Sequence, residues 1–471
     1  MKEVIPMDSK KGQWGSNFGF LMAAVGSAVG LGNIWGFPYK MGISGGFAFL
    51  LIYLVLAVFV GFVIMLGELT IGRKTGKGVL GAYSELSKNY AWIGWMGTIC
   101  PFLIMSFYTV LGGYAMKYMV ANFGDIFGAG FGVGGADSGA YFGEFLTKQG
   151  EGIVYTFLFC LVTWVIVRGG VSKGIEAFSK VAMPALFILL LIVIVRGLTL
   201  PGAMEGVAFM FKPSFEVFEG TGWITVLGRA GGQMFFSLSL GMGCMITYGS
   251  YLNKKENIEQ NAVIIPVLDT TVALLAGLAV MPTVFAMGME PGGGPGLLFV
   301  TLQAVFASMG GVGPIFGFLF YLFVVIAAVT SAVSLLEVAT ATFIDKEIAK
   351  GNEPNRHRAT LICIVFIFAL AVIVALDGLG SNGLPMPLGF IWLDFFDLFS
   401  EGIMMPLGAL SMSLIIGWKL GPKWMEDEIT ASGDKWKGKA FAMVCFKYIA
   451  PLGMLFILVG QLNGFFGWGL F

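Results

Sequence analysis

Long apolar stretches alternate with short polar connections along the whole length of this chain. A membrane-spanning helix needs about 20 mainly apolar residues, and eleven stretches of the sequence meet that requirement. The pattern predicts an all-α polytopic membrane protein that forms one domain over residues 1–471. The predicted spans cover residues 14–38, 46–71, 91–122, 152–168, 177–197, 221–251, 259–288, 314–344, 359–376, 388–418 and 440–465.

The composition supports this assignment and excludes several other classes of protein. Mean hydropathy is +0.85 and charged residues make up 12% of the chain, whereas a soluble domain has about 25% charged residues. The net charge is zero, so no electrostatic argument favours binding to nucleic acid. The five cysteines form no CxxC pair, and the single histidine, His357, lies in a polar loop. We therefore expect no disulfide framework, zinc site, haem or other organic cofactor.

Basic residues gather in alternate loops, which predicts the orientation in the bilayer. Three lysines precede the first span, whereas loops 124–147, 289–313 and 376–388 contain no Lys or Arg. Because positively charged loops stay in the cytoplasm, we predict a cytoplasmic tail over residues 1–13 and, with eleven spans, an outer C-terminus. The tail lacks the layout of a signal peptide, and the predicted location is the cytoplasmic (plasma) membrane.

The first span contains a glycine-rich interruption at Gly26, Gly30 and Gly32. Each glycine has about 1 kcal/mol less helix propensity than alanine. Backbone groups that are freed inside a membrane are tolerated only where they line a cavity or bind a ligand. Freed carbonyls suit a small cation and freed amides suit a carboxylate, so we interpret this break as the binding site of a transporter. The alternative is a glycine face that allows close helix packing.

A second interruption lies in the sixth span, within residues 235–243. Two interrupted spans at corresponding positions indicate an inverted repeat with a binding site at its interface. The predicted halves are residues 14–197, which hold spans one to five, and residues 221–418, which hold spans six to ten. The segment 440–465 is then an additional eleventh span.

Polar side chains near these interruptions offer oxygen ligands for sodium. Each hydroxyl also has a structural interpretation, because Ser and Thr often bond back to their own helix. Asp269 is a stronger candidate, since an ionisable group deep in a span is costly and marks function by default. Glu68 is expected to cap unwound backbone near the first break, and Glu337 is left open. The other candidates are Asn33, Ser237, Ser239, Thr330 and Ser331.

Several motifs together resemble one known family. The segment GSAVGLGNIWGFPY, from Gly26 to Tyr39, resembles the first-span signature of the neurotransmitter:sodium symporters, which share the leucine-transporter fold. The resemblance implies a 5+5 inverted repeat with broken helices 1 and 6, and the eleven-span form resembles the bacterial branch. It also implies a sodium-coupled symporter that works by alternating access and is not an enzyme. Further matches are Gly45–Phe49, Glu68 to Arg73, Lys173–Phe178, and Phe236–Gly241 followed by Tyr248.

The resemblance implies two sodium sites beside the first interruption. The carboxylate of the substrate would complete the first site, whereas the second would contain protein oxygens alone. The first site would use the Ala28 carbonyl, Asn33, Ser237 and Asp269, and the second the carbonyls of Gly26, Val29 and Ala327 with the hydroxyls of Thr330 and Ser331.

The resemblance also places the substrate between these two breaks. The amides of Leu31 and Gly32 and the hydroxyl of Tyr108 would bind its carboxylate, next to Ala28 and Ser237 of the first sodium site. Phe236 would also form the outer lid, and Lys11 with Asp345 would form the inner gate near Tyr251. The pocket for the substrate side chain would consist of Ile104, Tyr108, Phe236, Ser239, Met242, Ser331 and Leu335.

Position 30 indicates the class of substrate. Monoamine carriers of the family have an aspartate there that pairs with the amine, whereas this chain has Gly30. The substrate should therefore bring its own carboxylate, as an α-amino acid does. Ile104, Met242 and Leu335 predict a hydrophobic side chain, and the adaptable Met242 would admit aliphatic and aromatic substrates.

Three departures from the family pattern limit this transfer. The outer-gate arginine is replaced by Gly36 although its partner Asp397 is present, so Gln233 or water would have to substitute. The inner gate has Lys11 in place of arginine, which loses the bidentate fork. Span seven has Asp269 where asparagine is usual, and Ala273 offers no hydroxyl to a chloride ion near Tyr53 and Gln233. We therefore predict that Asp269 supplies the charge that chloride supplies elsewhere, and that it can accept a proton when sodium leaves.

Other functions stay open at this point. The same fold could be driven by protons through Asp269 or Glu337, although the Thr330–Ser331 hydroxyl pair suits a sodium ion better than a proton, which needs no such ligands. A channel needs a continuous polar lining, which the apolar pocket residues contradict. A membrane enzyme would need a nucleophile and base that these spans do not provide, and a receptor on a transporter fold would have no appended signalling domain.

Overall fold

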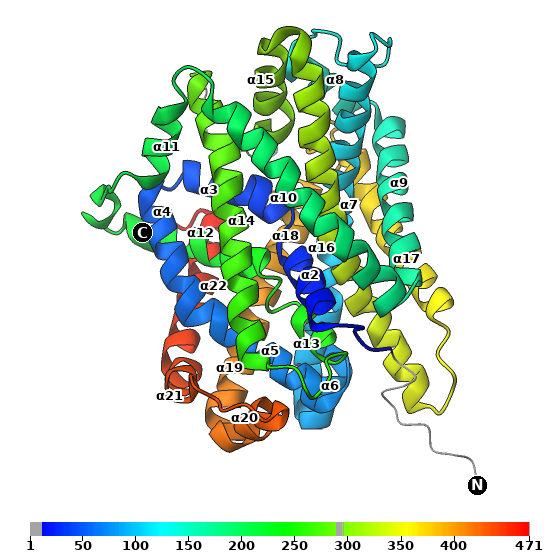
Figure 1. Ribbon diagram of the computed structural model, residues 1–471, viewed down its shortest axis with the longest axis vertical. Coiled ribbons are helices and arrows are strands. Elements are labelled where there is room, and N and C mark those ends of the chain that lie inside the picture. Colours follow the sequence, from blue (N-terminus) through cyan, green and yellow to red (C-terminus); the bar gives the residue numbers. More distant parts are fainter. Residues whose placement is uncertain (1–11, 289–293, 295, 471) are drawn as a thin grey trace.

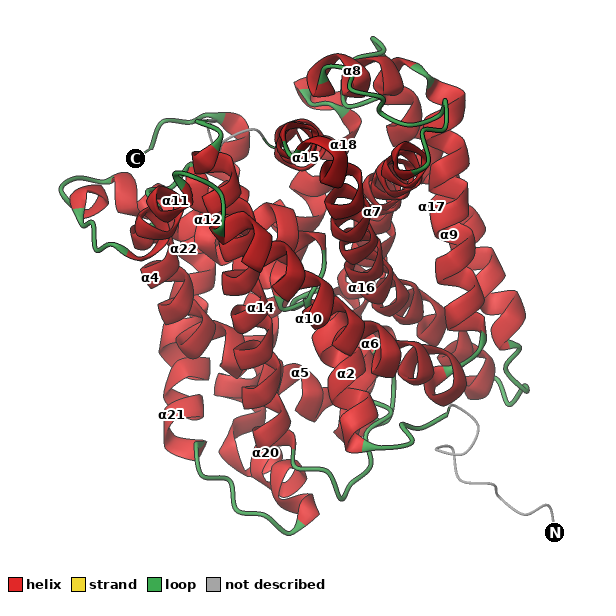
Figure 2. Ribbon diagram, turned by 45° about the horizontal axis from the view of Figure 1, so that its top comes forward, coloured by secondary structure: helices red, strands yellow, loops and turns green. Residues whose placement is uncertain are grey.

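The computed structural model of this protein describes residues 12–288, 294 and 296–470. This part of the chain contains helices and no strands, and it packs as a single helical bundle (Figures 1 and 2). The helices and single turns of the first predicted half are α2 (Asn17–Ala28), η1 (Gly32–Gly36), α3 (Phe37–Gly42), α4 (Phe47–Leu56), η2 (Ala57–Gly61), α5 (Phe62–Thr75), α6 (Val79–Leu86), η3 (Lys88–Tyr90), α7 (Ala91–Ile126), α8 (Ser138–Thr147), α9 (Gln149–Arg168), η4 (Val171–Glu176) and α10 (Ala177–Leu198).

The rest of the chain continues the same all-helical pattern. Its elements are α11 (Ala203–Phe211), η5 (Glu216–Phe218), α12 (Gly222–Ser237), α13 (Cys244–Gly249), α14 (Ile258–Ala286), η6 (Leu297–Thr301), α15 (Leu302–Ser308), η7 (Gly310–Val312), α16 (Gly313–Ala349), α17 (Arg356–Asp377), η8 (Pro387–Gly389), α18 (Trp392–Asp397), η9 (Leu398–Met404), α19 (Met405–Leu414), η10 (Ile415–Leu420), α20 (Gly421–Ile429), η11 (Thr430–Ser432), α21 (Lys439–Val444), η12 (Cys445–Ile449) and α22 (Ala450–Phe466).

All eleven predicted spans have a counterpart among these helices. Within the described residues, nine continuous helical stretches are long and apolar enough to cross a membrane. A tenth consists of Asn17–Ala28 and Gly32–Gly42, which meet at an angle of 48°. The sixth predicted span is divided into α12 and α13 by residues 238–243. Both predicted interruptions are therefore real breaks of the helix.

The backbone at each break explains why the helix ends there. Val29 follows α2 in an extended conformation, with φ −76° and ψ 99°. In the second break, Ser239, Gly241 and Gly243 have φ values of 53°, 77° and 80°, a left-handed region that favours glycine. A Cβ on Gly241 would lie 2.3 Å from the Met405 carbonyl oxygen, so this position requires glycine on two grounds.

Glu68 supports the second break and not the first. Its Oε1 accepts a hydrogen bond from the Gly241 amide at 2.7 Å, and its helix α5 packs against α13. The prediction that Glu68 caps the first break is therefore wrong. The reason is helical rotation, because the Glu68 face of α5 points toward the α12–α13 connection.

Glu176 anchors the start of the first broken span. Its Oε2 accepts from the Gly15 amide at 2.6 Å and its Oε1 accepts from the Ser16 hydroxyl at 3.0 Å. Ser16 in turn caps α2 by accepting from the Gly19 amide. These contacts hold the N-terminal end of α2 against η4, and α2 leads from there to the break at Val29.

The connections lie at two opposite ends of the bundle. In Figures 1 and 2, α8, α11 and α15 gather at one end, whereas α6 and α20 lie at the other. The predicted outer loops 124–147 and 289–313 contain α8 and α15, so the loops without basic residues share one end of the molecule.

Candidate functional site

The two breaks meet at Asn33, Ser237 and Asp269, three polar residues that are at most 1% exposed. Asn33 Nδ2 donates to Asp269 Oδ1 at 2.7 Å, and the Ser237 hydroxyl lies 2.8 Å from Asp269 Oδ2. The same hydroxyl lies 3.2 Å from Asn33 Oδ1. Tyr53 donates a longer hydrogen bond, of 3.4 Å, to Asp269 Oδ2. The structure therefore brings together the three side chains predicted for the first sodium site.

This cluster has the chemistry of a cation site. Within the described part of the chain, Asp269 forms no ion pair with a basic side chain, although it is completely buried. A buried carboxylate without a compensating charge is costly, and oxygen ligands suit hard cations. The donor set therefore fits sodium. Ala28, the remaining predicted ligand, is the last residue of α2.

A second group of oxygens lies where α16 passes the first break. The Thr330 hydroxyl lies 2.9 Å from the Ala327 carbonyl and 3.5 Å from the Val29 carbonyl. The Ser331 hydroxyl lies 3.3 Å from the Gly26 carbonyl and 3.4 Å from that of Val29. All five predicted members of the second sodium site are thus adjacent. Thr330 also bonds back to its own helix, which is the structural role that such hydroxyls often have.

Close packing around Gly30 and Gly32 defines the predicted carboxylate site. The Leu31 amide donates to the Tyr108 hydroxyl at 3.1 Å. A Cβ on Gly30 would lie 2.5 Å from that hydroxyl, and a Cβ on Gly32 would lie 2.7 Å from the Phe236 ring. Only glycine fits at these two positions while Tyr108 and Phe236 stay where they are.

A small cavity of about 20 Å³ lies beside these glycines. All seven residues predicted for the side-chain pocket line it, whereas Leu31 and Ser237 do not. Ser27 is a lining residue that the sequence analysis missed, although its place directly before Ala28 could have identified it. Its hydroxyl lies 2.6 Å from the Ser334 hydroxyl, and the Ser239 hydroxyl donates to the Ser27 carbonyl at 2.9 Å.

The inner-gate prediction is only partly described by the structure. Lys11 lies outside the described residues, and Asp345 Oδ2 accepts from the Gly78 amide at 2.6 Å. Tyr251, expected near that pair, donates to Glu337 Oε1 at 2.6 Å. Glu337 also forms an ion pair with Arg356. The residue left open by the sequence is therefore part of a buried charged group that ties Tyr251 to α16.

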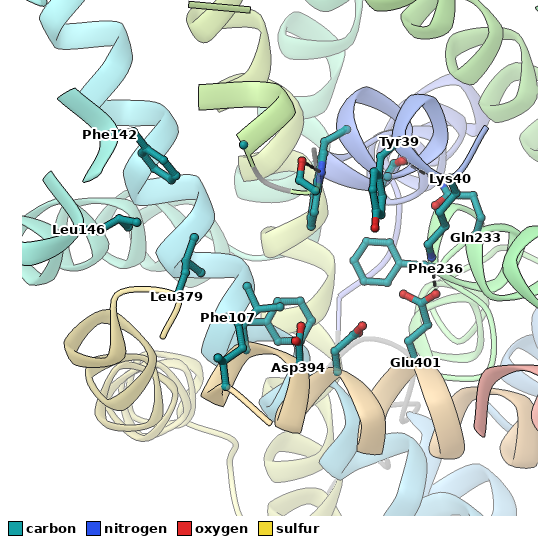
Figure 3. A pocket seen from close by; sticks show the side chains of 18 residues that line it. Tyr39, Lys40, Phe107, Phe142, Leu146, Gln233, Phe236, Leu379, Asp394 and Glu401 are labelled. Atoms are coloured by element: carbon teal, nitrogen blue, oxygen red, sulfur yellow. Dashed lines mark hydrogen bonds and ion pairs between the residues drawn. The ribbon is translucent and has the colours of Figure 1, made fainter. Parts of the chain in front are cut away.

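A larger cavity of about 480 Å³ lies on the other side of Phe236 (Figure 3). Gly36, Gln233 and Asp397, the residues of the altered outer gate, all line it. Gln233 Nε2 donates to the Gly32 carbonyl at 2.8 Å, and its Oε1 has no hydrogen-bond partner in the described part of the chain. The same cavity contains an ion pair between Lys40 and Glu401 that the sequence analysis did not predict.

Comparisons with known proteins agree with this architecture. The profile of the sodium:neurotransmitter symporter family matches residues 11–127 and 143–466. The uncharacterized sodium-dependent transporter YhdH of Bacillus subtilis is 36% identical over 97% of this chain and 99% of its own length. The uncharacterized sodium-dependent transporter MJ1319 of Methanocaldococcus jannaschii is 32% identical over 93% of this chain and 87% of its own. The crystal structure of MhsT with L-phenylalanine has a TM-score of 0.84 at 37% identity, covering 96% of this chain and all of that one.

Proposed function

Because the chain belongs to the sodium:neurotransmitter symporter family, and is therefore a sodium-coupled transporter of the membrane, we propose that it imports hydrophobic α-amino acids together with two sodium ions. The observation that carries this proposal is the meeting of both helix breaks at Asn33, Ser237 and Asp269, where Asn33 directly follows the Leu31 and Gly32 amides of the first break. A cation bound by this cluster would lie next to a substrate carboxylate bound by these amides. The binding of L-phenylalanine by MhsT supports an amino acid as substrate.

The carboxylate end of the substrate is recognised by backbone amides. The Leu31 amide and the Tyr108 hydroxyl already bond to each other at 3.1 Å, so a carboxylate can accept from both groups by displacing that contact. Gly30 leaves no room for an acidic side chain, since even a Cβ would lie 2.3 Å from the Ser331 hydroxyl. The negative charge must therefore come from the substrate.

The amine end faces hydroxyl oxygens whose hydrogens are already used. Ser239 donates to the Ser27 carbonyl, Ser334 donates to the Ser331 carbonyl, and the shortest contact of the Ser27 hydroxyl, 2.6 Å, is to Ser334. The free lone pairs of Ser27 and Ser239 thus remain as acceptors on the wall of the pocket. An acceptor surface suits an α-ammonium group.

The rest of the pocket selects an apolar side chain. Ile104, Met242 and Leu335 are buried and line the small cavity, and Phe236 covers it. Apolar walls with a few directed polar groups are typical of small-molecule sites. A hydrophobic side chain fits this environment, whereas a charged one would be left without a partner.

Coupling follows from the ligand that the two sites share. The substrate carboxylate completes the first sodium site, so each ligand raises the affinity of the other by the same factor. The second site, around Thr330 and Ser331, binds sodium between α16 and the first break and favours the arrangement in which they touch. While sodium is bound, Asp269 provides the negative charge at the first site, and transport is therefore independent of chloride.

The two ends of the bundle suggest the orientation in the membrane. The loops without Lys or Arg share the end that contains α8 and α15, and positively charged loops stay inside. This end is outer, the N-terminus is cytoplasmic and the C-terminus is outer. Residues 14–197 and 221–418 form the inverted halves, and each contributes one broken helix to the site.

Uptake into proteoliposomes tests the proposed function. Labelled Leu, Met, Phe, Tyr and Trp are compared under an inward sodium gradient, an inward proton gradient and no gradient, each with and without chloride. We expect sodium-driven uptake of one or more of them that is indifferent to chloride. Uptake that follows the proton gradient without sodium would contradict both ion sites, and sodium-driven uptake that requires chloride would contradict the role of Asp269.

A further inference from the structure

An ion pair at the wall of the outer cavity joins two segments that are distant in the sequence. Lys40 Nζ lies 2.5 Å from Glu401 Oε1, and the two side chains are only 19% and 8% exposed. Lys40 belongs to α3, the outer piece of the first broken span, whereas Glu401 belongs to η9 of the tenth predicted span. The contact therefore joins the first predicted repeat to the second.

The ion pair lies beside the proposed lid of the substrate pocket. Phe236 and Gly32 border both the cavity of about 480 Å³ and the small substrate cavity. Figure 3 shows the Phe236 ring next to the contact between Lys40 and Glu401. A substrate that moves from the outer cavity to the pocket must pass Phe236, and it does so next to this ion pair.

The positions of the two charges relate them to the altered gate residues. Lys40 follows Gly36 by four residues, and Glu401 follows Asp397 by four residues. Four residues are about one helical turn, and all four positions line the same cavity. A Cβ at Gly36 would lie 2.8 Å from Gln233 Oε1, so a side chain at position 36 would have to displace the end of Gln233. Lys40 and Glu401 thus lie one helical turn beyond Gly36 and Asp397, respectively.

We propose that Lys40 and Glu401 hold the outer side of the transporter closed, and that their ion pair must break before a substrate can enter. The pair fastens α3 to η9 in the closed arrangement, and separation of these helices removes it. Asp397 also lines the cavity and interacts electrostatically with Lys40, so the ammonium of Lys40 is attracted by a second carboxylate besides Glu401. Lys40 and Glu401 are positioning residues of the transport cycle and contact no substrate atom.

The test measures how readily the outer cavity opens, without using substrate. A reporter cysteine is placed in the cavity by Ile391→Cys, and a membrane-impermeant maleimide is applied to intact cells. All five native cysteines are buried, so background labelling is low. The reporter is combined with Lys40→Met, with Glu401→Gln, and with the charge exchange Lys40→Glu/Glu401→Lys.

We expect each single substitution to raise the labelling rate about fivefold, the size of effect typical of one partly exposed ion pair, and the charge exchange to restore the slow rate. The matched control is Lys117→Met, which removes the ion pair of 2.6 Å between Lys117 and Glu151 on α7 and α9. This variant should label at the unmodified rate. Unchanged labelling in both single variants would overturn the proposal, and so would a charge exchange that labels as fast as they do.

This inference rests on the proposed orientation, and the same assay separates the two. A reporter that reacts only in inside-out vesicles shows that the orientation is wrong. A reporter that reacts from outside at a rate insensitive to Lys40 and Glu401 shows that the orientation holds and the gate assignment fails. Sodium-driven uptake by the charge-exchanged protein, at a rate above that of Lys40→Met, is a second expected result.

Discussion

Removing the charge of Asp269 while keeping its shape tests the ion chemistry most directly. In Asp269→Asn, the amide oxygen can keep the hydrogen bond that Asn33 donates at 2.7 Å. The amide nitrogen would face the hydroxyls of Ser237 and Tyr53, which can rotate to accept. The change exchanges three charge-assisted hydrogen bonds for neutral ones, and we expect it to cost about 1–3 kcal/mol of stability. We therefore expect a folded protein that has lost one buried charge.

The loss of sodium affinity should be larger than the loss of stability. A unit charge at about 4 Å contributes about 4 kcal/mol when the effective dielectric constant is 20. The oxygens of Asn33 and Ser237 and the substrate carboxylate remain as ligands, so we expect part of this, a decrease of about 100-fold, or about 2.7 kcal/mol. Chloride should recover at least about tenfold of it, because it restores a negative charge near Tyr53 and Ser237.

The assay is equilibrium binding of a labelled amino acid as a function of sodium concentration, in gluconate and in chloride. Asp377→Asn is the matched control, since Asp377 is equally buried and accepts from the Gly380 and Trp392 amides away from the proposed ion sites. It should bind sodium as the unmodified protein does. Wild-type sodium affinity of Asp269→Asn in gluconate would refute the reasoning. Lost affinity that chloride does not recover would leave Asp269 as a ligand but refute the replacement of chloride.

Two other substitutions probe the breaks. Gly30→Ala places a methyl group 2.3 Å from the Ser331 hydroxyl and 2.5 Å from that of Tyr108. Because a displacement of about 1 Å can cost 100-fold in function, we expect uptake to fall about 100-fold. The control is Gly453→Ala, whose methyl group meets Val60 at 3.4 Å and should leave uptake unchanged. Retained uptake by Gly30→Ala would show that Tyr108 and Ser331 are not needed there. Glu68→Ala leaves the Gly241 amide without its acceptor and should lower the free energy of unfolding by about 1–3 kcal/mol. Glu68→Gln keeps an acceptor and should lose less stability. Equal losses of stability in thermal unfolding of the two variants would argue against the cap.

The helices and both breaks could be predicted from local sequence, because they depend on local properties. Apolar length determines which segments span, and glycine determines where a span cannot continue as a helix. Two of the three residues with positive φ between Ser239 and Gly243 are glycines, a signal that is visible without any tertiary information. The gathering of Thr330 and Ser331 at the first break was inferred from the family resemblance, which transfers a complete tertiary arrangement.

Pairings between distant segments could not be predicted in the same way. Lys40 and Glu401 are 361 residues apart, and nothing in the neighbourhood of either residue selects the other. Their shared offset of four residues from Gly36 and Asp397 was the available signal. For Glu68, the sequence indicated depth in the membrane but not rotation about α5, and rotation decides which break it reaches. Ser27 was missed because a serine next to Ala28 also fits a small-residue packing face.

The Gln233 side chain restricts how this protein can diverge. Its Nε2 bonds to the Gly32 carbonyl, and its Oε1 occupies the space into which any side chain at position 36 would grow. An arginine introduced at position 36 would meet Gln233 and would also compete with Lys40 for the same acidic wall. A larger residue at position 36 therefore requires the end of the Gln233 side chain to move, and we expect changes at positions 36, 40 and 233 to be linked. In a family alignment, these three columns should covary.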